Sequence, residues 1–308
     1  MIPQQTLAPV ALFVYSRPEH TLRALRSLKA NDLALESELF IFADGPKMDA
    51  TPDTLQKIKE TRSVIRQEQW CGKVNIIESE QNKGLANSIT SGVTQLCESH
   101  GQVIVLEDDL EISKGFLKYM NQGLQLYKGD TEVMHIAGYM YPVRIKLPDT
   151  FFVRAMFCWG WATWQRAWGQ FVNDAVHLYN QLEQLGFPAD YNIHSSNGFT
   201  ATLKANVDGT LNTWAIRWLT TIYLQHGLCL VPGKSLVRNI GHDGSGLHSG
   251  INEKYLDQQI QDHVKVYPIE KKVNQLAFNS IKKYYAKQEY SLKNRVLRRV
   301  YNVIGKNY

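Results

Sequence analysis

The sequence Gln102-Val-Ile-Val-Leu-Glu107-Asp108-Asp109-Leu110 joins a short apolar run to three consecutive carboxylates. The run from Val103 to Leu106 is typical of a buried strand in a parallel sheet. Ligands of open α/β sheets bind beyond the carboxyl ends of the strands, where three negative charges repel one another unless a cation neutralises them. Since Mg²⁺ and Mn²⁺ favour carboxylate oxygens, the pattern predicts a metal site that holds a nucleotide diphosphate. The alternative is that the three acids only cap the helix that follows.

Three more apolar runs, at 10–15, 38–43 and 73–78, alternate with segments of helical character. We expect helices to include 52–69 and about 113–127. This alternation favours βαβ units and a mostly parallel sheet. The chain contains neither the GxGxxG fingerprint nor the phosphate-binding GxxxxGK[ST] loop, so a nucleotide would be bound by another device.

Polar residues follow the predicted strands. Arg17 follows the first strand, where it could meet a phosphate or be only a solvated turn residue. Asp44 ends the second strand and could accept hydrogen bonds from a ribose or a base, although Asp-Gly-Pro is also a strong turn signal. After the third strand, Asn82-Lys-Gly84 forms a glycine turn that opens a helix. Ser16 and Glu19 have the spacing of a capping box.

Together, Asp44, the Asn82-Lys-Gly-Leu-Ala-Asn87-Ser segment and the Glu107-Asp-Asp-Leu strand end resemble the nucleotide-sugar half of GT-A-fold glycosyltransferases in the family-2-like group. The run from Val105 to Tyr119 is also similar to the Golgi N-acetylglucosaminyltransferase I type. The resemblance covers about residues 8 to 125. It implies an α/β fold with a Rossmann-like, mostly parallel central sheet flanked by helices, an acceptor-side second half and a C-terminal basic helix.

The resemblance also implies roles for single residues. Asp109 would contact Mn²⁺ or Mg²⁺, Asp108 the ribose or sugar of the donor, and Glu107 the sugar. Asp44 would contact the uracil or ribose and Arg17 the pyrophosphate. The remaining residues that we expect to bind the nucleotide sugar are Tyr15, Asn82, Gly84 and Asn87.

The second half is rich in tryptophan. Aromatic walls suit sugar rings, so we expect Trp159-Gly160-Trp161 to line the acceptor or sugar pocket, the alternative being a rigid aromatic core. Trp164 and Trp168, four apart on a predicted helix face, favour the core. Trp214 and Arg217 are further pocket candidates.

The catalytic base is not evident in the sequence. In the Golgi enzyme a segment comparable to 214–218 supplies the catalytic carboxylate, but here no acid lies between the two tryptophans. An inverting transfer needs a base for the acceptor hydroxyl, for which Asp208 and Asp243 are the candidates. The glycine-rich stretch 239–250 resembles a lid over the donor, and its His248 is a candidate metal or phosphate contact, although a loop histidine is usually only solvated.

The charges are concentrated in the tail. Residues 271–308 carry a net charge of +9, which leaves −4 for the remainder of the 308 residues. A basic amphipathic helix formed by Leu292, Val296, Val300, Val303 and Ile304 could lie in an anionic membrane interface or dock on the protein's own core. No nucleic-acid-binding motif accompanies the tail. The chain shows no run of about 18 apolar residues, no secretory signal and no cysteine pairing pattern, so we expect a cytoplasmic protein, peripheral on the inner face of the membrane.

These observations predict a glycosyltransferase of the hexosyltransferase type. It would move a sugar from a nucleotide-diphospho-sugar, with UDP-sugars first, to a glycan or lipid-linked acceptor in bacterial surface-polysaccharide or lipopolysaccharide synthesis, with metal assistance and inversion. We expect a nucleotide-sugar half at 1–130, an acceptor half at 131–268 and a basic tail at 269–308. The alternatives are a non-catalytic carbohydrate-binding or scaffold protein, and a sugar-phosphate nucleotidyltransferase, which should carry a phosphate loop where this chain has Tyr15-Ser-Arg-Pro-Glu19.

Overall fold

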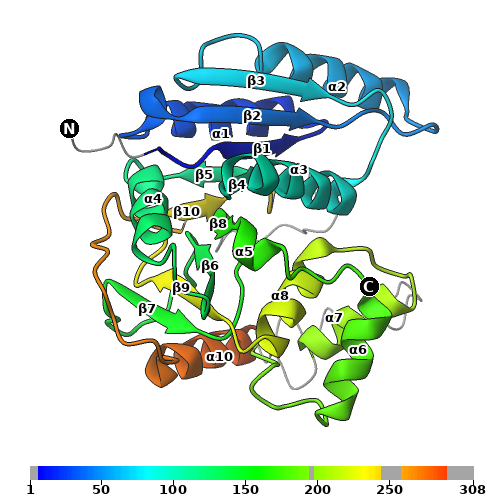
Figure 1. The fold of residues 1–308 in the computed structure, drawn as a ribbon. Helices are drawn as coiled ribbons and strands as arrows, with labels where there is room; N and C mark the ends of the chain where they lie inside the picture. Colours follow the sequence, from blue (N-terminus) through cyan, green and yellow to red (C-terminus); the bar gives the residue numbers. More distant parts are fainter. Residues whose placement is uncertain (1–5, 194–197, 244–257, 290–308) are drawn as a thin grey trace.

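A central sheet forms the body of the molecule (Figure 1). The computed structural model describes residues 6–193, 198–243 and 258–289. Within these ranges eight strands form one sheet, in the order β3 (Lys73–Glu78), β2 (Glu38–Ala43), β1 (Val10–Val14), β4 (Gln102–Glu107), β8 (Trp161–Trp164), β6 (Val133–Ala137), β9 (Leu228–Pro232) and β7 (Thr150–Val153). A separate ribbon pairs β5 (Leu110–Ile112) with β10 (Val237–Asn239).

The first half of the sheet is parallel. β1 pairs in parallel with β2 and β4, and β2 with β3. Every residue of β1 is buried, as are the apolar residues of β4, because helices cover both faces. The α/β fold with a mostly parallel sheet is therefore confirmed. The predicted strands at 38–43 and 73–78 coincide with β2 and β3.

Helices flank this half of the sheet. Figure 1 shows α1 (Pro18–Lys29) and α2 (Pro52–Val64) behind it and α3 (Leu85–His100) in front. The helix predicted at 52–69 ends earlier, since the indole of the buried Trp70 donates to the carbonyl of Ile65 and fixes the turn there. The capping box was wrong: Arg17, not Ser16, is the N-cap of α1, and no side chain caps it. Two further elements are a 3₁₀ turn, Ala34–Glu36, and α4 (Phe116–Leu126).

In the second half the sheet continues through β8, which runs antiparallel between β4 and β6. The helices here are α5 (Gln165–Trp168), α6 (Ala175–Gln184), α7 (Gly198–Val207), α8 (Trp214–Leu224) and α10 (Gln275–Glu289). Trp164 ends β8 and does not share a helix with Trp168, so that prediction was wrong, although both side chains are buried. Thr213 is the N-cap of α8.

The tail can be followed only in part. α10 packs beside β7, where the backbone N–H of Asn274 donates to the carbonyl of Phe152 over 2.8 Å. The predicted apolar face from Leu292 to Ile304 lies outside the described residues, as does His248. Among the helices that the structure describes, none combines the length and apolar character needed to cross a membrane.

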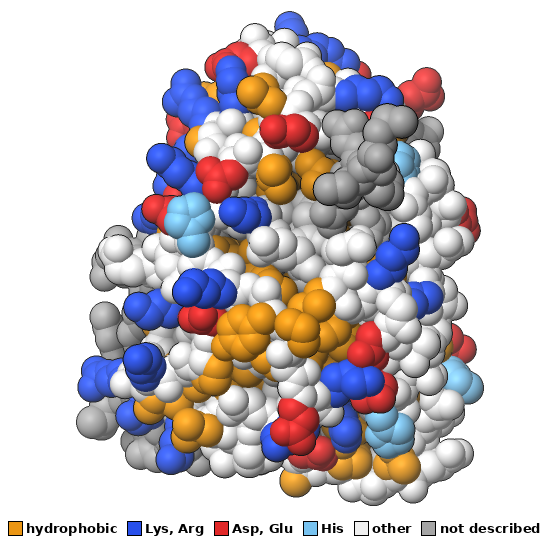
Figure 2. Space-filling model, turned by 60° about the vertical axis from the view of Figure 1, so that its left-hand side comes forward, with side chains coloured by type: hydrophobic (Ala, Val, Ile, Leu, Met, Phe, Trp, Pro, Cys, Tyr) orange, Lys and Arg blue, Asp and Glu red, His pale blue; other side chains and the backbone are white. Residues whose placement is uncertain are grey.

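One face of the surface mixes apolar and charged side chains. Figure 2 shows apolar side chains gathered across the middle of this face, with lysines, arginines and acids distributed above and below them. The basic side chains form no single stripe in this view, so the visible part of the face carries mixed charge.

His135 in β6 gives the core a pH dependence. Its ring is fully buried, accepts the indole N–H of Trp218 at Nδ1 and donates from Nε2 to the carbonyl of Phe157. Burial lowers the pKa of His135 to about 3, whereas an unfolded histidine titrates near 6.5. The neutral ring therefore stabilises the fold above pH 6.5, and this contribution is lost as pH falls from there towards 3.

We expect His135→Phe to be less stable than wild type at pH 7 but to lose less stability on acidification. Between pH 7 and 5 the wild type should lose about 2 kcal/mol more than the variant, measured by denaturant unfolding at both pH values. His177→Phe, at an exposed position of α6, should behave as wild type. If the free energy of unfolding depended on pH equally in wild type and His135→Phe, the buried ring of His135 would not be neutral as inferred.

Candidate functional site

A cleft of about 1500 Å³ lies along the carboxyl ends of the parallel strands. It is bounded by the turns after β1, β2 and β4, the start of α3, and the segments before α8 and after β10. Because parallel strands end at one edge of the sheet, residues far apart in sequence meet there. The predicted site residues that line the cleft are Tyr15, Arg17, Asp44, Asn82, Gly84, Glu107, Asp108, Asp109, Trp159, Trp214 and Asp243.

Of the predicted site residues that the structure describes, five do not line it. Asn87 is exposed and donates to the carbonyl of Lys83, and Asp208 is exposed beyond the end of α7. Gly160 is buried at a positive φ of 64°. Trp161 and Arg217 are buried behind the cleft wall. Both were predicted as pocket contacts, and the structure instead makes them supports of residues that do line the cleft.

The three carboxylates and Arg17 form the acidic edge, by which we mean Arg17 with Glu107, Asp108 and Asp109. The Arg17 guanidinium lies 2.9 Å from Oδ2 of Asp109 and 3.7 Å from Oδ1 of Asp108. Burial raises the pKa of Glu107 to about 8 and of Asp108 to about 7, and the charge of Asp109 adds to both shifts. Burial is the largest cause of both shifts, repulsion from Asp109 adds to it, and the positive charge of Arg17 opposes it.

A second segment closes on the acidic edge. β10 pairs with β5 immediately after the acids, and the backbone N–H of Ile240 then donates to the carbonyl of Asp109 over 2.8 Å. A Cβ on Gly241 would lie 2.3 Å from Oδ2 of Asp109. Only glycine therefore lets the backbone approach this carboxylate so closely.

The acidic edge fits a hard divalent cation. It offers carboxylate oxygens, the preferred ligands of Mn²⁺ and Mg²⁺, and the guanidinium of Arg17 shows that a cation is held against Asp109. Among the described residues, no group of three or more His, Cys, Asp or Glu side chains is arranged to hold a metal ion by itself. A metal at Asp109 would complete its ligands with phosphate oxygens and water, as Mg²⁺ commonly does.

Asp44 holds the loop that follows β3. Its Oδ1 accepts the backbone N–H groups of Gly45 and Lys83, both at 2.9 Å. Its Oδ2 accepts the backbone N–H of Gly84 and the amide of Asn82, both at 3.0 Å. The carboxylate therefore fixes the turn that opens α3 against the end of β2. The contact with uracil or ribose stays a prediction.

Replacing Asp44 should loosen this turn. In Asp44→Asn an NH₂ group replaces one of the two carboxylate oxygens and faces the two N–H donors that this oxygen had accepted. We therefore expect the backbone amide on that side, Lys83 if Oδ1 is replaced or Gly84 if Oδ2 is replaced, to exchange with solvent about tenfold faster or more. Hydrogen exchange resolved to single residues measures this. Glu78→Gln is the control, since Glu78 precedes the same loop but pairs with Arg66. Unchanged exchange in Asp44→Asn would show that the turn holds itself.

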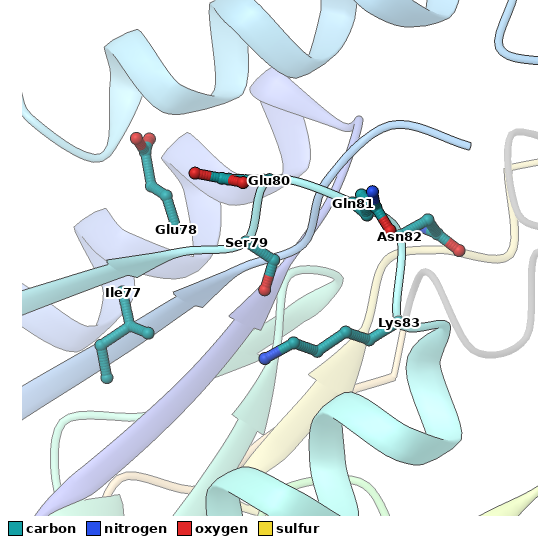
Figure 3. A pocket seen from close by; sticks show the side chains of 7 residues that line it. All are labelled: Ile77, Glu78, Ser79, Glu80, Gln81, Asn82 and Lys83. Carbon is teal, nitrogen blue, oxygen red and sulfur yellow. The ribbon is translucent and has the colours of Figure 1, made fainter. Parts of the chain in front are cut away.

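Behind this turn lies a smaller hollow of about 460 Å³, lined by residues 77–83 (Figure 3). In the figure Lys83 extends back below Ser79, while Glu78 and Glu80 point to the other side of the strand. Asn82 lines both this hollow and the cleft, so the loop held by Asp44 is the wall between them.

Aromatic rings form the wall opposite the carboxyl ends. Trp159 and Trp214 line the cleft. Trp161 lies behind them, fully buried, with its ring stacked on Trp214 at 5.0 Å and on His135 at 5.2 Å between centroids. Arg217 donates to the side chains of Asn173 and Asn212, both at 2.7 Å, and thereby holds the segment before α8 that faces the cleft.

His20 was not recognised from the sequence. It lies in the first turn of α1, lines the cleft, and its Nε2 is 3.1 Å from Oδ2 of Asp243. Of the two predicted bases, Asp243 thus lines the cleft with a histidine nitrogen close by, whereas Asp208 does not line it. The one signal in the sequence was the position of His20 one helical turn after Arg17.

The cleft is strongly acidic. Among the described residues that line it, nine are Asp or Glu and three are Lys or Arg. A nucleoside diphosphate would add further negative charge, so its binding here calls for an added cation.

Comparison with known proteins identifies the family. The model of glycosyl transferase family 2 matches residues 10–170. A search of curated proteins finds no match. Among solved structures, the chain is similar to the mannosyltransferase PcManGT from Pyrobaculum calidifontis, solved with GDP-Man and Mn²⁺ (14% identity, 65% of this chain and 52% of that chain, TM-score 0.37). It is also similar to residues 1–349 of TarS from S. aureus (12%, 93% and 72%, 0.40). The chain spans about half the length of the mannosyltransferase. Because the family model covers just over half of the chain, the protein belongs to glycosyl transferase family 2.

Proposed function

We propose that the protein transfers a sugar from a nucleotide-diphospho-sugar, with UDP-sugars as the first candidates, to a glycan or lipid-linked acceptor. One observation carries the proposal. Arg17, Asp44 and Asp109, which follow three different parallel strands, line a single cleft, in a chain whose family transfers sugars. Mn²⁺ or Mg²⁺ bound at Asp109 would act as a Lewis acid and neutralise charge on the departing diphosphate.

The residues of this chain would divide the chemistry as follows. Arg17 would bind the pyrophosphate, for which a planar guanidinium is suited. Asp108 and Glu107 would accept hydrogen bonds from the ribose or the sugar, and Trp159 would stack on a sugar ring. In an inverting transfer the acceptor oxygen bonds to the anomeric carbon while the bond to the phosphate oxygen breaks. The acceptor's proton would pass to Asp243, whose Oδ2 lies 3.1 Å from Nε2 of His20.

The cellular setting is part of the proposal. Synthesis of a bacterial surface polysaccharide or lipopolysaccharide at the inner face of the cytoplasmic membrane would suit a lipid-linked acceptor and the basic tail, whose residues 271–308 carry a net charge of +9.

Calorimetric titration of UDP, GDP, dTDP and CMP into the protein, with and without Mn²⁺, tests the proposal. We expect one of the four to bind with an affinity that rises with Mn²⁺, and hydrolysis of the corresponding nucleotide sugars then selects the donor. If a nucleotide binds but no nucleotide sugar is cleaved or transferred, the protein is a binding or scaffold protein on this fold. Failure of all four nucleotides with folded protein would overturn the proposal.

A further inference from the structure

Arg17 is placed rigidly against the acidic edge. It is the N-cap of α1, its carbonyl accepts the N–H of Thr21 at 2.9 Å, and Pro18 follows it in the first turn. Proline fixes its own φ and thereby the start of the helix. The guanidinium reaches Asp109 at 2.9 Å, with the arginine and both aspartate side chains no more than 19% exposed.

The oxygen that Arg17 contacts is enclosed from a second side. The Cβ position of Gly241 lies 2.3 Å from the same Oδ2 of Asp109, so the backbone there leaves little open space around this atom. Mg²⁺ binds its oxygen ligands at about 2.0–2.1 Å and keeps several waters around itself. Arg17 and a hydrated metal ion therefore compete for one acceptor.

We propose that Arg17 is the resident counter-ion of the acidic edge, and that it excludes a divalent metal from Asp109 until a diphosphate group draws its guanidinium away. The identity of that diphosphate rests on the proposed function, but the competition concerns only residues of this chain. Metal and nucleotide then enter together: each removes an obstacle to the other, which is a positive coupling between their binding sites.

The chemistry of arginine suits this exchange of partners. A guanidinium is always charged and presents several donors in a plane, which match a carboxylate and a phosphate equally well. Moving from Asp109 to a phosphate thus replaces one charge-assisted hydrogen bond by another. The metal that then binds Asp109 restores the neutralisation that the carboxylates lose when Arg17 leaves.

The decisive measurement is binding of Mn²⁺ alone, followed by the loss of the free-ion signal in electron paramagnetic resonance. Without nucleotide, Arg17→Gln should bind Mn²⁺ about tenfold tighter than the wild type. Arg23→Gln is the matched control: it removes the same charge from the same helix, but its partner is Glu111 at 2.8 Å, outside the cleft lining. It should bind Mn²⁺ as the wild type does. The increase in Mn²⁺ affinity should be absent from the double variant Arg17→Gln/Asp109→Asn.

A second measurement, of UDP binding, should change in the opposite direction. With Mn²⁺ saturating, Arg17→Gln should bind UDP about tenfold more weakly than wild type, because the phosphate loses its guanidinium. If Arg17→Gln does not fold, Arg17→Lys keeps the charge without the planar fork and should show the same two changes at smaller size.

The two proposals can fail separately. Mn²⁺ binding that is no tighter in the folded Arg17 variant, or equally tighter in Arg23→Gln, would overturn the competition. A gain in Mn²⁺ affinity in a protein that binds none of the four nucleotides would support the competition and refute the proposed function.

Discussion

Asp109→Asn is expected to abolish the metal dependence of nucleotide binding. The asparagine side chain has the size of aspartate but is a poor metal ligand. The nucleotide that binds the wild type, UDP or another of the four tested, should therefore bind the variant equally with and without Mn²⁺. Transfer or donor hydrolysis should fall at least about a hundredfold. Calorimetry with and without Mn²⁺, followed by kinetics with the selected donor, measures both effects.

The variant should fold. The backbone bond from Ile240 to the carbonyl of Asp109 does not involve the side chain, and removing one of three adjacent negative charges relieves repulsion. Glu111→Gln is the control, since Glu111 lies two residues on and pairs with Arg23 and Arg238 outside the cleft lining. Mn²⁺-dependent binding retained in Asp109→Asn would move the metal site away from this edge.

Trp161→Ala should cause the largest loss of stability. The side chain is fully buried and its ring stacks on Trp214 and His135. Removing a buried tryptophan leaves a large cavity and costs about 3–5 kcal/mol. For a chain of this size that lowers the melting temperature by roughly 10 °C. Because Trp214 lines the cleft and rests on Trp161, nucleotide-sugar turnover should also fall in the protein that remains folded.

Trp161→Phe separates packing from polarity. The indole Nε1 of Trp161 is buried without a hydrogen-bond partner in the described structure, so phenylalanine loses no bond there and should cost far less than alanine. Thermal unfolding of both variants tests this. A loss below about 1 kcal/mol in Trp161→Ala would contradict a role for this ring in holding the cleft wall.

The parallel half of the sheet was predictable because its signals are local. β2 and β3 are short, mainly apolar runs, and Arg17, Asp44 and Asp109 in the cleft lining closely follow β1, β2 and β4. The family-2-like resemblance rested on these residues, and the match over residues 10–170 confirms it.

Other features depend on contacts between distant segments. The four donors to Asp44 include Lys83 and Gly84, about 40 residues on, and sequence gives no sign that they turn towards it. Trp159 lines the cleft while Trp161 is in the core, although both have the residue type of a sugar wall. The pairing of β8 with β4 decides this: Trp161 is the first residue of β8 and lies opposite Val105 within the sheet, whereas Trp159 precedes the strand, before Gly160 with its positive φ.

Arg17 and His20 are two more residues whose contacts with distant segments could not be predicted from the sequence. Both lie at the start of α1, yet one contacts the acidic edge and the other reaches Asp243 after β10. The capping-box pattern of Ser16 and Glu19 suggested a local role for this turn. In the structure the arginine and the histidine instead lie against acids from distant segments, Asp109 after β4 and Asp243 after β10.

The contact between Gly241 and Asp109 limits how this protein can be recombined. In a chimera that takes the second half of the chain from a relative, the junction cannot simply fall between the two halves. Residues 237–239 pair with β5, and the backbone that follows leaves no room for a Cβ at position 241 beside Asp109. A chimera that imports a larger residue at position 241 would crowd the carboxylate of Asp109 and disturb the acidic edge. Segments 107–112 and 237–241 should therefore be taken from the same parent protein, although more than 120 residues separate them in the sequence.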